Sequence, residues 1–552
     1  MLVLSVAWVT SVGVLMLWLA GTPGPFLREQ LKSLQFWSLE VCVALGLALG
    51  AALLRERPGY LQKTDVVFIT LLSSAALILT LLVAPRTNRI YYDEQIYQSI
   101  GQNLSDLRLA QMCNDGNVEY GRLRCSSGEY NKQPYAYPHL LSLAYRVFGV
   151  GESVAFAVNA AVMALTVCAL YALVVVLFDD RRAAFFAGLL IVMIPHQVLW
   201  SATAAAEPSA ALACIVAVLA AAHFVRAKRT LALGAAGVAA AYAVQFRPES
   251  MLILGVLAPL FWRDRSEVAR PRFWWIALLV VILLMVHIGH LFAVKNEGWG
   301  TTDARLSLQY LPNNLQVNGW FYFGDGRFPF VVTLLAIVGL AGRHHRLERM
   351  TIGLWFAAFF GIFLLFYAGS YNYGADVRYS VMTYPPAAIL AGLGAARIGG
   401  WLERQTFAVS GHTAVAGALL FQFLWYVPLV RDTTEEAWAA RADVQFAKSM
   451  VGQLRGTAYV LTHNPGMFHV WGVNAGQLSH ALADPGRVDF LLGRYSGGVF
   501  LHWNFWCNVL DPIQQAVCRR ALAAKPVETA AEYVERDQRY AMYRVLPAPR
   551  RD

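Results

Sequence analysis

Residues 154–182 read VAFAVNAAVMALTVCALYALVVVLFDDRR, and this stretch decides the class of fold. Its first 25 residues carry no charge, and a bilayer span needs roughly 20 predominantly apolar residues. The two arginines at its end are typical of the cytoplasmic side of a span, because cytoplasmic connections are enriched in Lys and Arg. The stretch therefore predicts a transmembrane helix next to a cytoplasmic connection.

Similar apolar stretches recur along the whole chain. Hydrophobic residues make up 57% of the sequence and charged residues only 14%, against roughly 45–50% and 25% in soluble domains. This composition excludes a string of soluble domains, intrinsic disorder, collagen-like repeats and disulfide scaffolds. We expect about thirteen transmembrane helices, near residues 2–20, 36–54, 65–84, 154–178, 183–200, 208–225, 231–246, 251–262, 273–293, 329–341, 351–368, 381–396 and 406–427.

The charges between these stretches predict the orientation of the chain. Six alternate connections hold 17 Lys or Arg residues, whereas four short intervening connections hold only four. The positive-inside rule places the first set and the N-terminus in the cytoplasm, and an odd number of spans places the C-terminus outside. Residues 85–153, 294–328 and 428–552 then lie outside. The net charge of +10 fits topology and contact with anionic membrane lipid, so we expect no nucleic-acid partner.

This orientation divides the chain into two predicted domains. Residues 1–427 form the transmembrane domain, and residues 428–552 form a small periplasmic α/β domain. The outer loop 85–153 carries amphipathic stretches at residues 93–112 and 135–148, which predict helices on the membrane surface. The tail mixes strand-like runs with a helix-like run, at residues 458–462, 498–501 and 514–524.

The cysteines support the predicted orientation. Four of the seven fall in segments assigned to the outside: Cys113 and Cys125 in the first loop, and Cys507 and Cys518 in the tail. Two local pairs in an oxidising compartment predict two disulfides. Four free thiols or a metal site are the alternatives.

Ionisable residues gather at the predicted outer ends of the spans, where charges are costly and usually functional. They include Asp93 and Glu94 after the third span, Lys132 in the first loop, Glu207 before the sixth span, Arg247 between the seventh and eighth, and Arg378 with Tyr379 before the twelfth. Together they predict an outward-facing pocket with carboxylates and cations. Carboxylates can take a proton from an acceptor hydroxyl, and Arg and Lys can hold a membrane-borne phosphate as a bond breaks.

Each of these residues also has a purely structural interpretation. The alternatives are a helix start for Asp93, Glu94 and Glu207, snorkelling to the interface for Lys132, a turn charge for Arg247, and an ion pair with Asp376 for Arg378. His287 and His290 are three residues apart and share a helix face. With a carboxylate they could bind a metal, but we assign no metal ligand.

Five short motifs occur in a fixed order over roughly residues 85–400. They are Asp93-Glu94 with Tyr97; Asn131-Lys132-Gln133-Pro134-Tyr135 ahead of Leu140-Leu141; Ala206-Glu207-Pro208; Phe246-Arg247-Pro248-Glu249; and Arg378-Tyr379-Ser380 with Tyr384-Pro385. With these motifs the chain resembles the GT-C fold glycosyltransferases. The similar branch contains bacterial aminoarabinose–lipid A transferases and protein O-mannosyltransferases.

The resemblance implies a multi-pass enzyme of the bacterial inner membrane, acting in the cell envelope. It implies an inverting transfer, on the periplasmic face, from a polyprenyl-phosphate-linked sugar donor to a glycan, glycolipid or protein acceptor. The implied roles are catalytic base for Asp93 with Glu94 as its neighbour, acceptor site for Glu207, and donor-phosphate contacts for Lys132, Arg247, Arg378 and Tyr379.

The sequence departs from the family at two positions. Asn131 stands where relatives often carry Glu, and one relative uses that Glu to hold a metal. Gln133 separates Lys132 from Pro134, where relatives join them. No cofactor is implied with certainty, and a divalent metal stays open.

Three other functions remain alternatives at this point, one of which is a scaffold for envelope assembly. A lipid-linked oligosaccharide ligase or polymerase should carry a long outer loop with His and Arg instead of an early acid pair. A membrane transporter should show repeated halves and ionisable residues near mid-span. Here the charges cluster at the outer ends of the spans.

Overall fold

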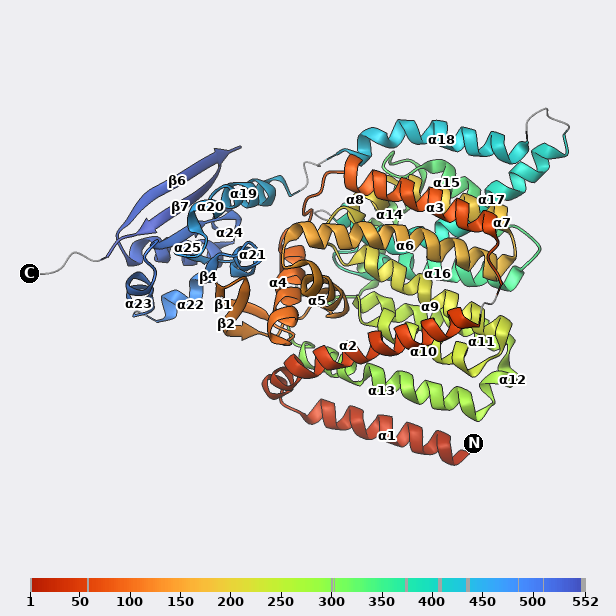
Figure 1. Cartoon of the computed structure of the whole chain (residues 1–552), viewed down its shortest axis with the longest axis horizontal. Helices are drawn as coiled ribbons and strands as arrows, with labels where there is room; N and C mark the ends of the chain where they lie inside the picture. The colour runs from red at the N-terminus through yellow and green to blue at the C-terminus, as the bar shows by residue number, and fades with distance from the viewer. Residues whose placement is uncertain are drawn as a thin grey trace, which may run out of the picture. The chain divides into compact units, whose positions relative to one another are not determined.

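The computed structural model describes residues 2–56, 59–298, 301, 303–372, 376–405, 410–432, 437–484, 486–509 and 511–547. The chain forms two compact units, which Figure 1 draws with their helices and strands labelled. The first unit comprises Met1–Thr87, Lys132–Tyr137 and Phe156–Thr433. The second comprises Asn88–Asn131, Pro138–Ala155 and Thr434–Asp552.

The first unit is a bundle whose long helices run side by side (Figure 1). Each of the thirteen predicted apolar stretches forms a helix or a broken helix here, except that residues 406–409 lie outside the described residues. The helices are α1 (Leu2–Gly21), α2 (Gly24–Arg55), α3 (Lys63–Ile78) with η1 (Leu79–Val83), α6 (Glu152–Phe178), α7 (Arg181–Met193) with α8 (Pro195–Ser201), α9 (Glu207–Ala227), α10 (Thr230–Val244), α11 (Leu252–Arg263), α13 (Pro271–Ala293), α15 (Phe330–Leu340), α16 (Arg346–Leu365), α17 (Tyr384–Glu403) and α18 (Gly411–Val430). Shorter elements connect them: η2 (Pro248–Met251), α12 (Arg265–Val268), η3 (Leu308–Tyr310), α14 (Leu311–Phe323) and η4 (Asp376–Thr383).

Several of these helices are long and apolar enough to cross a bilayer. Among the described residues seven meet that condition, and the pair α7 and α8 makes an eighth if it counts as one bent span. The 67° bend falls where α8 begins at Pro195, because proline disfavours helical backbone in the residue before it. The chain is therefore a multi-span membrane protein. The total of thirteen spans stays a prediction.

The second unit combines the tail with most of the first outer loop, which the predicted domain division kept apart. The loop supplies α4 (Tyr92–Leu107), α5 (Ala136–Phe148) and a hairpin of β1 (Met112–Glu119) and β2 (Arg122–Glu129). Strand β1 pairs antiparallel with tail strand β4 (Asn474–Gln477). The two predicted amphipathic stretches therefore form helices, α4 and α5, and the strands between them belong to the sheet of this unit. Their place on the membrane surface stays a prediction.

One seven-stranded sheet organises this unit, in the order β2-β1-β4-β3-β5-β7-β6. Its other strands are β3 (Tyr459–Thr462), β5 (Val499–Trp503), β6 (Val527–Glu535) and β7 (Gln538–Val545). Strands β4, β3 and β5 run parallel, and the remaining pairs are antiparallel. The tail helices are α19 (Trp438–Ser449), α20 (Val451–Leu454), α21 (Pro465–Val470), α22 (Leu478–Ala483), α23 (Arg487–Arg494), α24 (Phe505–Asn508) and α25 (Pro512–Ala524).

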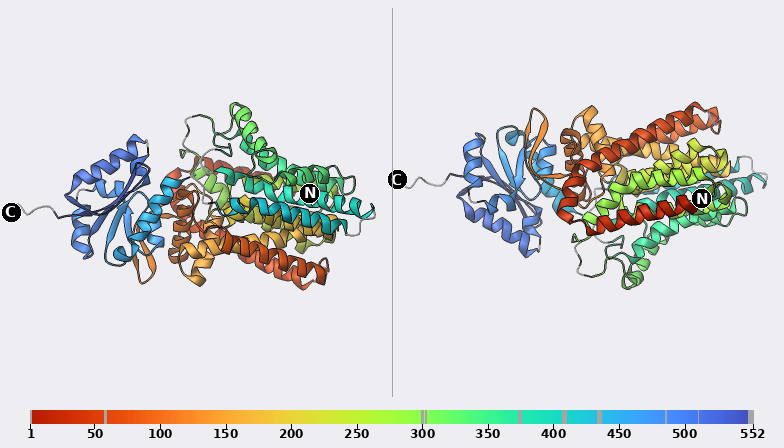
Figure 2. Two further views of the ribbon diagram at one scale, coloured as in Figure 1. Left: turned by 90° about the horizontal axis from the view of Figure 1, so that it is seen from above. Right: turned by 90° about the horizontal axis from the view of Figure 1, so that it is seen from below.

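Side chains on both faces of this sheet are buried, which makes the unit three-layered. Val460 packs on one face with residues of α19 and α21, whereas its neighbours Tyr459 and Leu461 pack on the other with α22, α23 and α25. Successive strand residues point to opposite faces, so alternating apolar residues build two cores. Figure 2 shows the strands between the two sets of helices.

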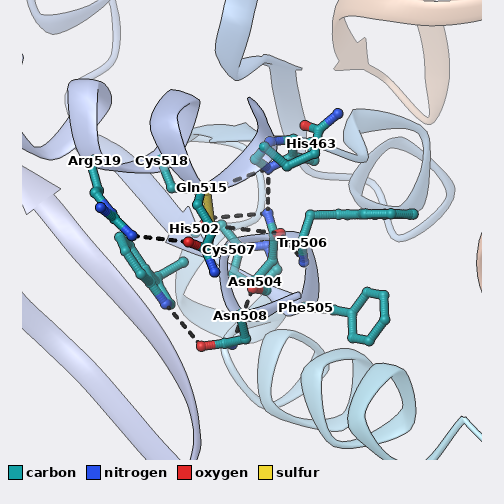
Figure 3. Close-up of a disulfide and its surroundings, with 12 residues drawn as sticks. His463, His502, Asn504, Phe505, Trp506, Cys507, Asn508, Gln515, Cys518 and Arg519 are labelled. Carbon is teal, nitrogen blue, oxygen red and sulfur yellow. Dashed lines mark hydrogen bonds between the residues drawn. A yellow bond between two sulfur atoms is a disulfide. The ribbon is translucent and has the colours of Figure 1, made fainter. Parts of the chain in front are cut away.

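Both predicted disulfides are present. Cys113 is bonded to Cys125 across the β1–β2 hairpin, and Cys507 in α24 is bonded to Cys518 in α25. Figure 3 shows the second bond beside His463, whose Nδ1 lies 3.2 Å from Asn504 Nδ2. Each bond closes a short loop within the second unit.

The disulfides predict a thiol-labelling pattern. In the native protein, a maleimide reagent should not modify Cys113, Cys125, Cys507 or Cys518, because their sulfurs are bonded. After reduction, peptide mass spectrometry should find all four modified. Modification of any of the four before reduction would contradict the pairing.

Helix α4 is anchored to the tail by close packing against α21. A Cβ atom at Gly466 would lie 2.6 Å from the Cβ of Ser99 in α4. The amide of Gln102 also donates to the carbonyl of His469 at 3.3 Å. The absence of a side chain at Gly466 therefore allows the two helices to approach.

We predict opposite effects for two glycine substitutions in the tail. Gly466→Ala should destabilise the second unit by about 1–3 kcal/mol, the usual range for overpacking. Gly493→Ala is the matched control, since a Cβ there meets nothing within 4 Å and alanine favours a helix. The measurement is the thermal unfolding midpoint of the full chain in detergent. Equal midpoints for the two variants would contradict the tight contact.

Candidate active site

The first unit contains a buried ion cluster built around one carboxylate. Glu207 is fully buried at the start of α9, and its Oε1 accepts a hydrogen bond from Arg247 Nη1. Arg378 Nε lies 3.4 Å from the same oxygen. Arg247 also donates through Nε to Glu249. Three segments that are distant in sequence thus meet at the Glu207 carboxylate. The guanidinium groups of Arg247 and Arg378 are nearly buried.

The local sequence explains why Glu207 lies at this point. Pro208 fits the first turn of a helix, where its missing N–H costs nothing, so α9 begins here. Asn159, within α6, donates its side-chain amide to the carbonyls of Thr203 and Ala205, at 2.7 and 2.8 Å. These bonds hold the turn before α9. The positive end of the helix dipole also stabilises the Glu207 carboxylate.

Tyr379 is the aromatic member of the cluster. Its ring centroid lies 5.6 Å from the Arg247 guanidinium carbon and 5.1 Å from that of Arg378. Phe363 stacks on the ring, with centroids 4.3 Å apart. Cations within about 6 Å of a ring face are attracted to it. Tyr379 therefore orders both arginines. The side chain of Asp376, the alternative partner of Arg378, lies outside the described residues.

The segment that carries Lys132 is held near the same helix ends. Ala136 N donates to the carbonyl of Gln245, two residues before Arg247, at 3.2 Å. Lys132 Nζ donates to the carbonyl of Gly298 at 2.6 Å. The structure thus brings Glu207, Arg247, Arg378 and Tyr379 together and ties the Lys132 segment to the end of α10.

The opposite end of the bundle carries the predicted basic connections. Arg229 follows α9 and pairs with Glu56 at 2.8 Å. Arg182 lies in the first turn of α7 and pairs with Glu403 at 3.2 Å. Arg181 pairs with Asp65 at 3.1 Å. The ion cluster at the start of α9 and the basic connections therefore lie at different ends, as the orientation argument requires.

The two acids of the first predicted motif belong to the second unit, at the start of α4. Glu94 Oε2 accepts from the backbone N–H groups of residues 89, 90 and 91, at 2.6, 2.9 and 3.1 Å. This is the helix-start role weighed above as its structural alternative. Asp93 is half-buried in the same first turn. Trp506 packs edge-on against the neighbouring Tyr92, with centroids 5.2 Å apart.

The geometry gives little support for a metal centre among these residues. His287 and His290 stack on each other with centroids 5.8 Å apart, and Tyr135 packs edge-on against His290. Among the described residues, the one group of three potential ligands is His463 with Cys507 and Cys518. Both sulfurs are committed to the disulfide, and burial lowers the pKa of His463 to about 4.

Sequence reasoning missed Asn159 and underrated Glu249. Asn159 is the only amide in the apolar run 154–178, and polar residues inside spans usually have a task, so the signal was present. Glu249 was given no role beyond its place in the Phe246-Arg247-Pro248-Glu249 motif. It is the second carboxylate partner of Arg247.

Solved structures share this fold. ArnT from Cupriavidus metallidurans in the apo state aligns with a TM-score of 0.55 and 14% identity, covering 87% of this chain and 97% of that one. The same enzyme bound to undecaprenyl phosphate aligns with a TM-score of 0.53 and 16% identity, with the same coverage of both chains. An Archaeoglobus fulgidus oligosaccharyltransferase tethered with an acceptor peptide aligns with a TM-score of 0.50 and 12% identity. That alignment covers 84% of this chain and 71% of that one.

A family model adds evidence about chemistry. Residues 132–290 match the family described as dolichyl-phosphate-mannose-protein mannosyltransferase, a stretch that includes Lys132, Glu207 and Arg247. The chain therefore has the membrane-protein fold of these GT-C glycosyltransferase structures, and part of it is similar to the mannosyltransferase family. No match was found among curated proteins. The matched part of the chain begins at the Lys132 segment and ends in α13.

Removal of the central carboxylate tests the cluster. Glu207→Ala should destabilise the protein by about 3–5 kcal/mol, because it leaves buried guanidinium groups without their shared acid. Glu29→Gln is the control, since Glu29 is exposed and its loss breaks only a surface ion pair with Lys32, which should change little. Thermal unfolding in detergent measures both. A similar loss of thermal stability in the two variants would contradict a stabilising role for the buried cluster.

Proposed function

We propose that the protein moves a sugar from a polyprenyl-phosphate donor to an acceptor hydroxyl, with inversion at the anomeric carbon. The reaction takes place at the outer face of the inner membrane of a bacterium. The observation that carries this proposal is the buried cluster of Glu207, Arg247 and Arg378 at one end of a bundle of apolar helices. An enzyme that handles a lipid phosphate needs cations at the edge of the bilayer.

Known relatives of the fold support a lipid-linked donor. The ArnT structure was solved bound to undecaprenyl phosphate. The matched family is described by its dolichyl-phosphate-mannose donor. Both lipids carry a phosphate on a polyprenyl chain, and the membrane around the bundle accommodates that chain.

The cations stabilise the leaving group in this mechanism. As the bond between the anomeric carbon and the phosphate oxygen breaks, negative charge grows on polyprenyl phosphate. Arg247, Arg378 and Lys132 offer N–H donors to it, and charge-assisted hydrogen bonds are stronger than neutral ones. Glu207 and Glu249 fix the guanidinium groups beforehand, so little reorganisation is needed when the charge develops. Tyr379 holds the two arginines at a set spacing.

Asp93 is the proposed catalytic base. The acceptor hydroxyl gives its proton to this carboxylate as its oxygen attacks the anomeric carbon from the face opposite the phosphate. One carbon–oxygen bond forms while another breaks, and the sugar inverts. Glu94 contributes indirectly, because its three backbone hydrogen bonds fix the turn that presents Asp93. Glu207 contributes to the acceptor side as well as to the cation cluster.

The acceptor is a glycan, a glycolipid or a protein. A lipid-linked oligosaccharide ligase is the related alternative, and it would use the same phosphate-binding cations. The glycosyltransferase class of the matched family argues against a transporter.

A transfer assay tests the proposed function. The purified protein is incubated with polyprenyl-phosphate sugars and bacterial envelope fractions, and mass spectrometry detects sugar-modified products. Asp93→Asn should lower kcat by roughly 10²–10⁴-fold, the range for loss of a general base, with little change in the donor KM. Glu119→Gln, in the exposed pair with Arg124 of the hairpin, is the control and should keep full activity.

Two results would contradict the proposal. Full transfer by a folded Asp93→Asn variant would exclude this residue as the base. Absence of transfer from every monosaccharide donor, with transfer from a lipid-linked oligosaccharide, would favour the ligase.

A further inference from the structure

A polar pocket lies in the second unit and shares no residue with the ion cluster. It has a volume of about 240 Å³ in the second unit, and its polar lining residues are Asp115, Tyr459, Gln477, His480, Asp484 and Arg487. Leu461 and Gln477, also in the lining, stand at the carboxyl ends of the parallel strands β3 and β4. Open α/β sheets bind ligands at this edge of their parallel strands.

A fixed hydrogen-bond network forms one wall of the pocket. Asp115 Oδ1 accepts from the hydroxyl of Tyr459, and its Oδ2 accepts from Arg487 Nη2. Burial and the Asp115 carboxylate raise the pKa of Tyr459, so this hydroxyl stays a donor. Both carboxylate oxygens of Asp115 are therefore already engaged.

The backbone around this wall is shaped to place Asp115. The register of β1 shifts on both sides of Asp115, which marks a β-bulge, and the Cys113–Cys125 disulfide lies beside it. Bulges commonly redirect a side chain near a site. Opposite Asp115 stands Gly476, where a Cβ would lie 2.3 Å from the Tyr459 hydroxyl oxygen. The glycine thus leaves room for the tyrosine to reach the carboxylate.

The chemistry of the lining argues against an ionic ligand. A metal ion would compete with the two hydrogen bonds of Asp115. A phosphate would meet Asp115 and Asp484 next to Arg487, so the pocket offers no excess of positive charge. The lining instead mixes donors with acceptors. One acceptor, Gln477 Oε1, is buried without a hydrogen-bond partner among the described residues.

We propose that this pocket binds one ring of a neutral saccharide. Sugar hydroxyls both donate and accept hydrogen bonds, so they match a lining that holds the acceptors Gln477 and Asp484 together with the donors Arg487 and His480. The volume is below the roughly 300–1,000 Å³ of pockets for drug-sized ligands, which fits a single ring. The proposal concerns binding in the tail and does not depend on the transfer reaction.

Saccharide binding to the full chain in detergent tests this assignment. Saturation-transfer NMR with maltotetraose, cellotetraose and mannotetraose should show binding by at least one of them. Arg487→Met should weaken that binding roughly tenfold or more, as loss of a charged hydrogen-bond donor does. Arg494→Met is the matched control, because Arg494 is exposed on the same helix α23 and is absent from the pocket lining.

A second variant separates binding from folding. Gln477→Met removes the buried acceptor and should also weaken binding, while the thermal midpoint stays that of the wild type. Binding that persists in a transfer-inactive Asp93→Asn variant would support the pocket independently of the proposed function. The proposal is overturned if no saccharide binds, if Arg487→Met and Arg494→Met bind alike, or if inorganic phosphate or Mg²⁺ displaces the saccharide.

Discussion

The carboxylate of Glu207 is the constraint on which the first unit depends. It is fully buried at the start of α9. It pairs with Arg247, which follows α10, and with Arg378, which precedes α17. Removing one member of a buried ion pair costs several kcal/mol, so these three helix ends are bound to one another. The same condition suits an enzyme, because groups that cannot move apart stay aligned for a ligand.

Much of the first unit could be predicted from sequence. Length and apolarity identify the long helices, since those properties are local, and the described parts of the thirteen stretches form helices or broken helices. The cluster of Glu207, Arg247, Arg378 and Tyr379 could also be predicted from the sequence. A charged residue beside an apolar run is visible as an anomaly in the sequence. The sequence shows Pro195 at the bend between α7 and α8, but the bend itself was not predicted.

The second unit was harder to predict, for a physical reason. Its contacts join residues far apart in the chain: Asp115 meets Arg487 across 372 positions. Strand pairing depends on which edges meet, and no local pattern encodes that choice. For this reason the hairpin β1–β2 was not foreseen, although the cysteines at its two strands were paired correctly. The saccharide pocket, which needs three strands and two helices, was equally hidden.

The join between β1 and β4 also sets an order of events during biosynthesis. Val118 bonds to Asn474, which leaves the ribosome 356 residues later. At about 5–20 residues per second, the hairpin waits roughly 20–70 seconds for its neighbour. Throughout that interval the edge of β1 that will meet β4 stands without its partner strand, while the intervening spans enter the bilayer. A nascent chain that stops before residue 474 therefore leaves this edge open to pairing with other chains.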